Sequence, residues 1–229
     1  MESTLEAEQV NSIMNRYIHV AVRLSLQAVL SFVEKVNEEH KILQQDLQDI
    51  IVNVMRPLDL FRAKLFLYSG EARYNFAFYR YDADSKELYP YHRIVDSRIS
   101  TRGRHWKPRK GHIGLCFTKG EVLYSPDVTK SPELAQDHEE GDAENYRSFI
   151  SVPVFRSVRG FENENARGSD YVEGVLVVTS SELEQFDKRA HSNFLKMISM
   201  IISLVFQLPE GKVLKDNGGN GNSTEEKST

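Results

Sequence analysis

The chain has 229 residues, a formal net charge of −4 and a hydrophobic content of 40%, which is enough for one substantial domain with a packed core. The acidic balance argues against a general nucleic-acid-binding protein, which usually carries an excess of basic residues. The single cysteine, Cys116, excludes an intramolecular disulfide and leaves no set of thiols for a structural zinc site.

The N-terminal region carries no pattern typical of a targeting or membrane-spanning segment. Residues 1–8 are acidic, whereas a secretory signal begins with positive charge. The most apolar early stretch, residues 17–33, contains Arg23 near its centre, and one central arginine costs roughly 2.5–3.5 kcal/mol in a membrane. We therefore expect no signal peptide, no membrane span and, with a single cysteine, a cytoplasmic protein.

Residues 5–56 contain no glycine or proline, and their apolar residues recur with helical spacing. One row comprises Val10, Ile13, Tyr17, Val20 and Leu24, and a second comprises Met14, Ile18, Val22, Val29, Val33 and Val36. Together they are broader than a two-stranded coiled-coil seam, and two apolar faces need two partners. We expect residues 1–56 to form a helical segment that packs on the domain and pairs with a second copy, giving a coiled-coil-type homodimer. One long helix and two shorter helices folded on one core both fit this pattern.

From Arg62 onward the pattern changes to short runs of β-type residues separated by turn sequences. These runs are Ala63–Tyr68, Tyr74–Tyr81, Leu88–Val95, Val122–Ser125, Phe149–Phe155 and Gly174–Thr179. We expect six strands. The first three are expected to form an antiparallel meander, because turn sequences follow the first and the second run.

The remaining segments are expected to be helices and loops. A helix opens at Gly111, and the sequence Ser131-Pro132-Glu133 is typical of a second helix start. The acidic run 137–144 and the polar segment 158–170 are expected to be a solvated loop and a long hairpin connection.

Two further expectations concern the C-terminal part. A closing helix is expected to begin at residues 181–184, which have capping-box spacing, and to run to Pro209. Residues 209–229 are polar and are expected to be a disordered tail.

The order of these elements and three motifs resemble the GAF domain family. The first motif runs from Gly111-His-Ile-Gly114 to Gly120-Glu-Val-Leu-Tyr-Ser-Pro-Asp127. The second is Arg147-Ser-Phe-Ile-Ser-Val-Pro-Val154, and the third is Gly174-Val-Leu-Val-Val178 followed by Phe186-Asp187. Each motif alone is weak, but their order and spacing together are fairly specific.

The resemblance covers about residues 40–207 and implies an α+β fold with a GAF-like domain over residues 57–208. It implies a six-stranded antiparallel sheet with the N- and C-terminal helices on one face. The other face would carry a ligand pocket roofed by the loops of residues 97–147. Family members typically bind small molecules such as cyclic nucleotides, tetrapyrroles or amino acids, usually as dimers. A shared fold does not determine the ligand, so these molecules are only an analogy for the ligand of this chain.

The loop 98–110 holds six basic residues, and this local reversal of charge is the best sequence indication of a ligand site. Arginine binds phosphate or carboxylate through two hydrogen bonds, and the glycines that follow let helix-end amides approach an anion. A solvated or partner-facing loop is the alternative. The candidate ligand-binding residues are Arg98, Arg102, Arg104, Trp106, Arg109, His112, Gly114, Tyr91, Phe78 and Asp127.

Catalytic and metal-binding chemistry are weakly indicated. Cys116 is the one candidate nucleophile, but reduction of free methionine sulfoxide by this family needs a second thiol to resolve the oxidised one. The histidines and acidic residues near the loop have no metal-ligand spacing, so no metal is expected and no cofactor is identified.

The sequence therefore favours a non-catalytic sensory protein that binds a small anionic or planar ligand, such as a nucleotide, and signals through dimerisation or a partner protein. A structural interaction module with a filled pocket is the alternative hypothesis. Neither the ligand nor the partner can be named from the sequence.

Overall fold

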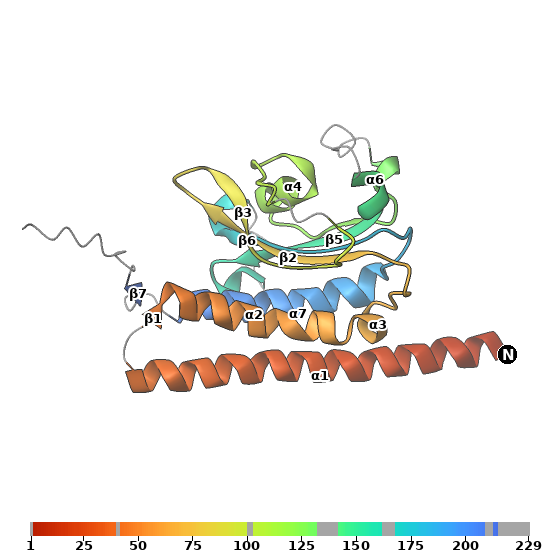
Figure 1. Ribbon diagram of the computed structural model, residues 1–229, viewed down its shortest axis with the longest axis horizontal. Helices are drawn as coiled ribbons and strands as arrows, with labels where there is room; N and C mark the ends of the chain where they lie inside the picture. The colour runs from red at the N-terminus through yellow and green to blue at the C-terminus, as the bar shows by residue number, and fades with distance from the viewer. Residues whose placement is uncertain are drawn as a thin grey trace, which may run out of the picture.

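The computed structural model describes residues 2–39, 42–99, 103–131, 142–161, 168–208 and 213–214. Its layers are stacked in a fixed order (Figure 1). They are the long helix α1 (Glu2–Glu39), then helices α2 (Gln44–Leu60) and α7 (Lys188–Gln207), then an antiparallel sheet, and finally α4 (Gly111–Lys119) and α6 (Asp142–Asn145). We call the sheet face toward α2 and α7 the lower face, and the face toward α4 and α6 the upper face.

The N-terminal segment forms two helices rather than one, which settles the open alternative. Helix α2 runs back along α1, and the Ser25 hydroxyl of α1 donates to the Val54 carbonyl of α2 at 2.8 Å. Lys35 and Asp46 form an ion pair at 2.7 Å near the turn. The N-terminal end of α1 reaches past the short helix α3 (Arg62–Leu65) and beyond the sheet (Figure 1).

The main sheet has five antiparallel strands in the order β3-β2-β6-β5-β4. They are β2 (Tyr74–Asp82), β3 (Glu87–Val95), β4 (Leu123–Ser125), β5 (Ser148–Phe155) and β6 (Val172–Ser180). A separate parallel pair joins β1 (Ile42–Leu43) to β7 (Val213–Leu214). Short 3-10 helices are η1 (Val128–Lys130), η2 (Val158–Phe161) and η3 (Ser169–Tyr171).

The expectation of a sixth strand at residues 63–68 is wrong. These residues continue from α2 into α3, and the helical turn places Leu65 and Phe66 in the core with no exposed surface. Phe66 lies at the centre of an aromatic group that includes Phe76 and Phe194, with ring centroids 5.6 and 5.9 Å away. Burial of these rings against α7 therefore outweighs the β-type composition of the segment.

The closing helix also begins later than the capping-box sequence predicts. It starts after Asp187, whose carboxylate accepts the Ala190 N–H. Glu184 has a φ of 54°, which ends any regular helix there. The turn before α7 instead buries Phe186, which is 3% exposed.

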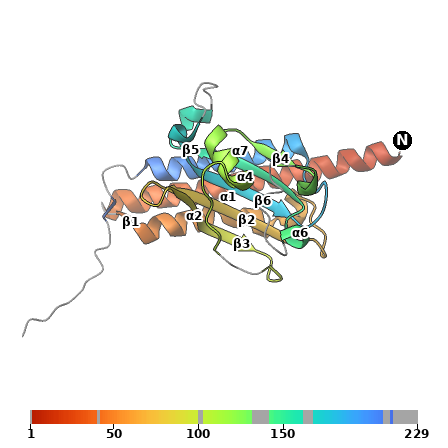
Figure 2. The ribbon, with the colours of Figure 1, turned by 90° about the horizontal axis from the view of Figure 1, so that it is seen from above.

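The two faces of the sheet have different chemistry because successive side chains of a strand point to opposite sides. On β2, Phe76 and Phe78 lie in the lower core with the helices, whereas Ala77 and Tyr79 belong to a second core under α4. The upper face also carries Asn75, by the same alternation. Figure 2 shows α4 and α6 lying over this face of the sheet, so the side chains of the upper face point toward these two helices.

Several expectations fall on residues outside the described part of the chain. They are the helix start at Pro132, most of the acidic run before Asp142, part of the 158–170 connection and the tail after Leu208 apart from β7. In the described part of the chain, none of the helices combines the length and hydrophobicity that crossing a membrane requires.

Candidate functional site

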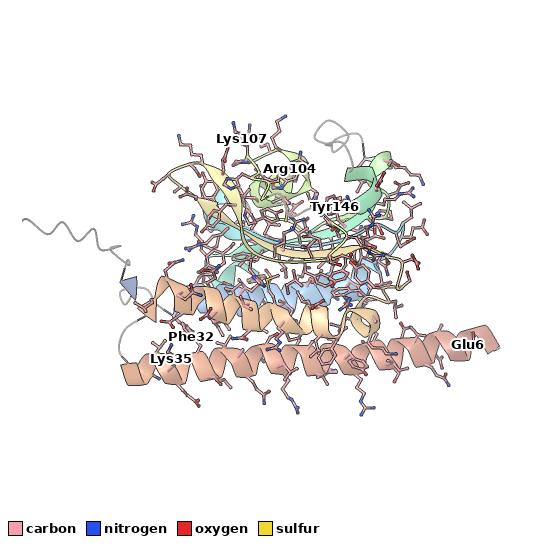
Figure 3. All side chains as sticks on the ribbon, viewed as in Figure 1. Glu6, Phe32, Lys35, Arg104, Lys107 and Tyr146 are labelled. Atoms are coloured by element: carbon pink, nitrogen blue, oxygen red, sulfur yellow. The ribbon has the colours of Figure 1, made fainter. Side chains whose placement is uncertain are left out.

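Polar side chains from separate elements gather on the upper face, and we call this group the upper-face cluster. Its members are Asn75, Tyr79, Arg93, Arg104, Trp106, His112, Tyr146, Ser151 and Thr179. They come from β2, β3, the loop before α4, α4 itself, the residue after α6, β5 and β6. In Figure 3, Arg104 and Tyr146 lie above the sheet, on the side away from α1.

Arg93 joins the edge of the sheet to the segment that follows α6. It pairs with Ala77 across β2 and β3, so its side chain stands next to those of Asn75 and Tyr79. Its Nε donates to Asn75 Oδ1 at 2.5 Å, and one terminal nitrogen donates to the Tyr146 hydroxyl at 2.8 Å. Three elements are thus tied together by one guanidinium group.

His112 is fixed in the first turn of α4. Its Nδ1 is hydrogen bonded to the Ser151 hydroxyl at 2.6 Å, and its ring stacks on Phe149 with centroids 4.0 Å apart. Gly114 lets the preceding loop approach α4, because an added Cβ would lie 2.2 Å from the Lys107 carbonyl oxygen. Gly114 therefore allows close contact between α4 and the loop that precedes it.

Trp106 connects the loop before α4 to β3 through its backbone and to α4 through its ring. Its backbone exchanges two hydrogen bonds with Leu88, at 2.7 and 2.9 Å. The Arg104 guanidinium lies over the indole, 4.1 Å from its centroid. Gly111, at a φ of 57°, leaves room for the ring, since an added Cβ would lie 2.3 Å from indole Cζ3.

Tyr79 is a buried member of the cluster, 5% exposed. Burial and, less, Tyr146 raise the pKa of its hydroxyl above the ordinary value, while the charges of Arg93 and Arg104 and the nearby indole of Trp106 act in the opposite direction. The indole nitrogen approaches this hydroxyl but does not meet hydrogen-bond geometry with it. These opposing effects place both arginines and the indole close to one hydroxyl group. Burial is the largest of these effects, so the pKa of Tyr79 stays above its ordinary value and the hydroxyl is protonated at neutral pH.

Two polar atoms of the cluster are buried without a hydrogen-bond partner among the described residues. They are the indole Nε1 of Trp106 and Oγ1 of Thr179, a residue that is 2% exposed. Thr179 pairs with Asn75 on one side and with Phe149 on the other, so its side chain lies on the upper face. Leaving such an atom unpaired costs about 1–3 kcal/mol each, which makes a bound partner for them favourable.

Three other buried atoms share this condition but do not belong to the cluster: His92 Nε2, His191 Nε2 and Ser192 Oγ. His92 pairs with Phe78, whose ring lies in the lower core, and the other two residues lie in the first turn of α7.

The structure gives separate roles to three other candidates from the sequence. Arg98 pairs with Asp96 at 2.8 Å and lowers the pKa of that carboxyl to about 2. Asp127 caps η1 by accepting the Thr129 N–H at 3.1 Å. Arg109 is exposed, and its backbone N–H donates to Gly114 and Thr118. These residues hold loops in place and do not join the upper-face cluster.

Phe78 and Tyr91 lie on the opposite face of the sheet from the cluster. Both rings contact Phe206 of α7, with centroids 5.7 Å away in each case. The pairing of β2 with β3 shifts register at a bulge between Phe78 and Tyr79. Tyr91 of β3 therefore lies on the lower face, in the same core as Phe78. The structure therefore brings together Arg104, Trp106, His112 and Gly114 from the sequence-based set, and Arg102 lies outside the described residues.

Cys116 is buried under α4 and has no exposed surface. Its thiol donates to the Glu121 carbonyl at 3.2 Å, and burial raises the pKa of the thiol well above its ordinary value. A thiol in this state forms little thiolate at neutral pH, and the thiolate is the reactive form. Among the described residues, no group of three or more His, Cys, Asp and Glu side chains is arranged to hold a metal ion.

Sequence reasoning missed Asn75, Arg93, Tyr146 and Thr179. One signal was available: on β2, Tyr74, Phe76 and Phe78 alternate with Asn75, Ala77 and Tyr79. The more polar of these two rows is the one to assign to the face away from the helices. Tyr146 and Thr179 could not be found this way. Tyr146 joins the cluster through its hydrogen bond with Arg93, and Thr179 through the pairing of β6 with β2 and β5.

No family model and no curated protein matches the sequence. Solved structures with a similar fold include the free methionine-R-sulfoxide reductase of Neisseria meningitidis in complex with its substrate, at 18% identity and a TM-score of 0.52, covering 90% of this chain and 92% of that one. The substrate complex of the Staphylococcus aureus enzyme is similar at 18% identity, a TM-score of 0.51 and coverage of 82% and 95%. The GAF domain of Acinetobacter phosphoenolpyruvate-protein phosphotransferase is similar at 18% identity, a TM-score of 0.50 and coverage of 81% and 93%. The chain thus has a GAF-like α+β fold.

These similarities correct the expectation of a non-catalytic sensor. The solved structures with this fold include reductases, which are enzymes, so the conclusion from the GAF resemblance that the protein is not an enzyme is wrong. At this level of identity the likeness establishes the fold, and function has to be argued from the site.

Proposed function

We propose that the upper-face cluster is the site where this protein binds a small polar molecule, as a substrate or as a ligand that it holds. The observation that carries the proposal is the pair of buried polar atoms without a partner, Trp106 Nε1 and Thr179 Oγ1, in a cluster that also holds Arg93 and Arg104. Buried polar atoms in folded proteins are nearly always paired, so a partner supplied from outside the chain accounts for both.

The rigidity of the cluster supports the same proposal. His112 is held by Ser151 and Phe149, and Arg93 is held by Asn75 and Tyr146. Side chains fixed in advance lose little freedom when a ligand arrives, and this improves affinity.

Ligand-observed NMR with a set of small polar metabolites tests the proposal. We expect saturable binding by at least one compound, lost in Ala77→Leu, which adds bulk at the centre of the cluster, and in Thr179→Val, which removes one hydroxyl. Ala28→Leu, in the groove between α1 and α2, is the matched control and keeps binding. Binding that survives both cluster variants, or no binding by any compound, contradicts the proposal.

Reduction of free methionine sulfoxide is a second candidate, favoured by the fold shared with the two reductases in complex with their substrate. In that reaction the sulfoxide is reduced to a sulfide while two thiols are oxidised to a disulfide and water is released. This chain has one cysteine, so an external dithiol such as dithiothreitol must supply the electrons.

The assay measures conversion of free L-methionine-R-sulfoxide to methionine by chromatography in the presence of dithiothreitol. Because Cys116 is buried with a raised pKa, we expect any turnover to be unchanged in Cys116→Ser. Turnover that disappears in this variant would instead assign the nucleophile to Cys116. No turnover above the dithiol alone rules out the second candidate.

We also propose that two copies of the chain pair along α1, as the helix pattern predicts. Val10 and Ile13 are 41% and 47% exposed at the end of α1 that reaches beyond the domain. The row that they begin continues through Tyr17 and Leu24 into a groove of about 570 Å³ between α1 and α2. Figure 3 shows Phe32 and Lys35 at the α2 side of α1, and Glu6 at its projecting end.

A parallel pair related by a two-fold axis fits this surface best. The domain covers one side of α1, so a two-fold axis parallel to the helix places the two domains on opposite sides of the pair (Figure 1). Light scattering after gel filtration should give twice the mass of the 26.3 kDa chain. Ile13→Glu should give a monomer, whereas Asn15→Glu, away from the row, should remain a dimer. A monomeric wild-type protein contradicts the pairing.

A further inference from the structure

We infer that α1 and α7 together bind an amphipathic helix of a partner protein, one that carries acidic residues beside its apolar row. We call this surface the α1–α7 face. Its exposed apolar members, each between 36% and 62% exposed, are Leu26, Leu30, Met197, Leu204 and Leu208. The surface lies on the opposite side of the sheet from the upper-face cluster, so the inference is independent of the proposed small-molecule site (Figure 1).

The rotation of α1 places two of these leucines away from α2. Ala28 lines the groove between α1 and α2. Each residue of an α-helix turns the chain by about 100°, so Leu26 and Leu30, two residues before and after Ala28, both lie about 160° around the helix from it. Val29, which is 7% exposed, belongs to the buried row between the two sides. Because α1 packs on α7 as well as on α2, the leucines lie on its α7 side.

Met197, Leu204 and Leu208 form one row along α7, since they are spaced by seven and four residues. Phe206 is two residues from both leucines, so it lies about 160° around the helix from each of them. Its ring contacts aromatic rings of β2 and β3. The row therefore points away from the sheet, toward the layer that α1 occupies (Figure 1).

The exposed apolar side chains thus border one another along two neighbouring helices. Single exposed leucines are common on protein surfaces, whereas a group of this kind marks an interaction site. A surface shared by two packed helices suits an amphipathic helix that inserts apolar residues from successive turns. Helix α7 has 20 residues and is roughly 30 Å long, so a partner helix of several turns can lie along it.

The charge of this face is opposite to that of the whole chain. The chain has a net charge of −4, yet neither α7 nor residues 9–33 of α1 contains an aspartate or a glutamate. Arg23, Arg189 and Lys196 are exposed on these two helices. Arg23 lies on the same side of α1 as Leu26 and Leu30, three and seven residues before them. Acidic residues of a partner are attracted by this surface and basic residues are repelled, which makes an acidic helix the complementary partner.

A second copy of the chain is a poorer occupant of this face. A symmetric contact would bring Arg23 and Lys196 of two copies into one interface, with no acidic residue from these segments to offset them. The row proposed above for pairing lies elsewhere on α1, because Leu26 follows Ile13 by thirteen residues and lies about 140° around the helix from it. The chain can therefore pair along α1 and bind the partner helix at the same time.

Two labelled peptides test the inference by fluorescence anisotropy with the full chain. Each is three heptads long with leucine at a and d, and the peptides differ only at e and g, which are glutamate in one and lysine in the other. Like charges at e and g keep each peptide from pairing with itself. We expect saturable binding of the glutamate peptide, about tenfold or more tighter than that of the lysine peptide and weakened by added salt.

Substitutions of exposed residues locate the bound peptide. Leu30→Glu and Leu204→Glu should each weaken the glutamate peptide about tenfold or more, because each replaces an apolar contact by a like charge. Leu60→Glu is the matched control, since Leu60 is 63% exposed but lines the groove between α1 and α2. The double variant Arg23→Glu with Lys196→Glu should reverse the preference and bind the lysine peptide more tightly. Circular dichroism confirms that each variant is folded.

The contrary outcomes are distinct. Equal affinity for the two peptides, or no binding of either one, overturns the inference. Binding lost in Leu60→Glu but kept in Leu30→Glu and Leu204→Glu places the peptide in the other groove and also overturns it. Ile13→Glu, which should disrupt pairing along α1, should still bind the glutamate peptide. If Leu204→Glu instead converts a dimer to a monomer in light scattering, the face pairs two copies and the inference fails.

Discussion

The hydroxyls of Ser199 and Ser203 below the central sheet and of Thr179 above it are all buried, yet they differ in their partners. Below the sheet, the hydroxyls of Ser199 and Ser203 on α7 donate to the carbonyls of Pro153 and Phe155, each at 2.6 Å. Above it, Thr179 Oγ1 is equally buried and has no partner among the described residues. The Ser199 and Ser203 hydroxyls fasten α7 to β5, whereas the Thr179 hydroxyl is available to a ligand.

The same contrast holds for aromatic side chains. Below the sheet, Phe66 contacts Phe76, Phe186 and Phe194 in one apolar group. Above it, Trp106 combines an arginine over its ring with an unpaired N–H. The lower face is thus built for stability, and the upper face keeps polar groups at a cost in stability, as binding sites commonly do.

Removing a lower-face ring should have the largest effect on stability. Phe66→Ala empties the centre of the aromatic group, and the free energy of unfolding should fall by about 3–5 kcal/mol. Urea unfolding followed by circular dichroism measures the change. A loss below about 1 kcal/mol would show that this core is not the main source of stability.

A smaller loss is expected where the loop meets α4. Gly111→Ala places a methyl group against Trp106 and forces alanine to a φ of 57°, so the free energy of unfolding should fall by about 1–3 kcal/mol and the tryptophan emission should change. Gly70→Ala is the matched control, since no atom lies within 4 Å of its added Cβ. Equal effects of the two variants would contradict the close packing of Trp106 on Gly111.

Protonation of His191 should make the free energy of unfolding depend on pH. Its Nδ1 accepts the Asp187 N–H at 2.9 Å, and burial lowers the pKa of the ring below its ordinary value, partly opposed by Asp187. Because the folded pKa lies below the unfolded value of about 6.5, this contribution is fully present above pH 6.5 and is lost as the pH falls.

The measurement is urea unfolding between pH 8 and pH 5, where one such group changes the free energy by at most about 1.4 kcal/mol per pH unit. His191→Gln should reduce the slope. His92→Gln is the comparison variant, because burial also lowers the pKa of His92 and its contribution has the same sign. An unchanged slope in His191→Gln would contradict a neutral, buried His191.

The sequence predicted the parts of the fold that have a clear local period. The runs at 74–81, 88–95 and 149–155 are strands because alternating residues meet two buried faces. The segment 63–68 has a similar composition, but its rings are needed against α7, and tertiary packing decided its structure. Local patterns cannot show such a requirement.

The candidate site was predicted only on its loop side. Arg104, Trp106 and His112 lie close together in the chain, so charge and composition point to them. Arg93 and Thr179 are more than eighty residues apart, and each looks like an ordinary strand residue until the register of β3, β2 and β6 places them around Ala77. Sites built across strands are therefore hidden from a single sequence.

One pair of variants compares the two faces most directly: Ser199→Ala below the sheet and Thr179→Val above it, each measured without ligand by urea unfolding. Ser199→Ala should lower the free energy of unfolding by about 1 kcal/mol or more, because the Pro153 carbonyl loses its buried donor. Thr179→Val should leave that free energy unchanged or raise it, because it removes a buried group without a partner. A clear loss of stability in Thr179→Val, equal to that of Ser199→Ala, would show that this hydroxyl has a structural role and would contradict an upper face kept for a ligand.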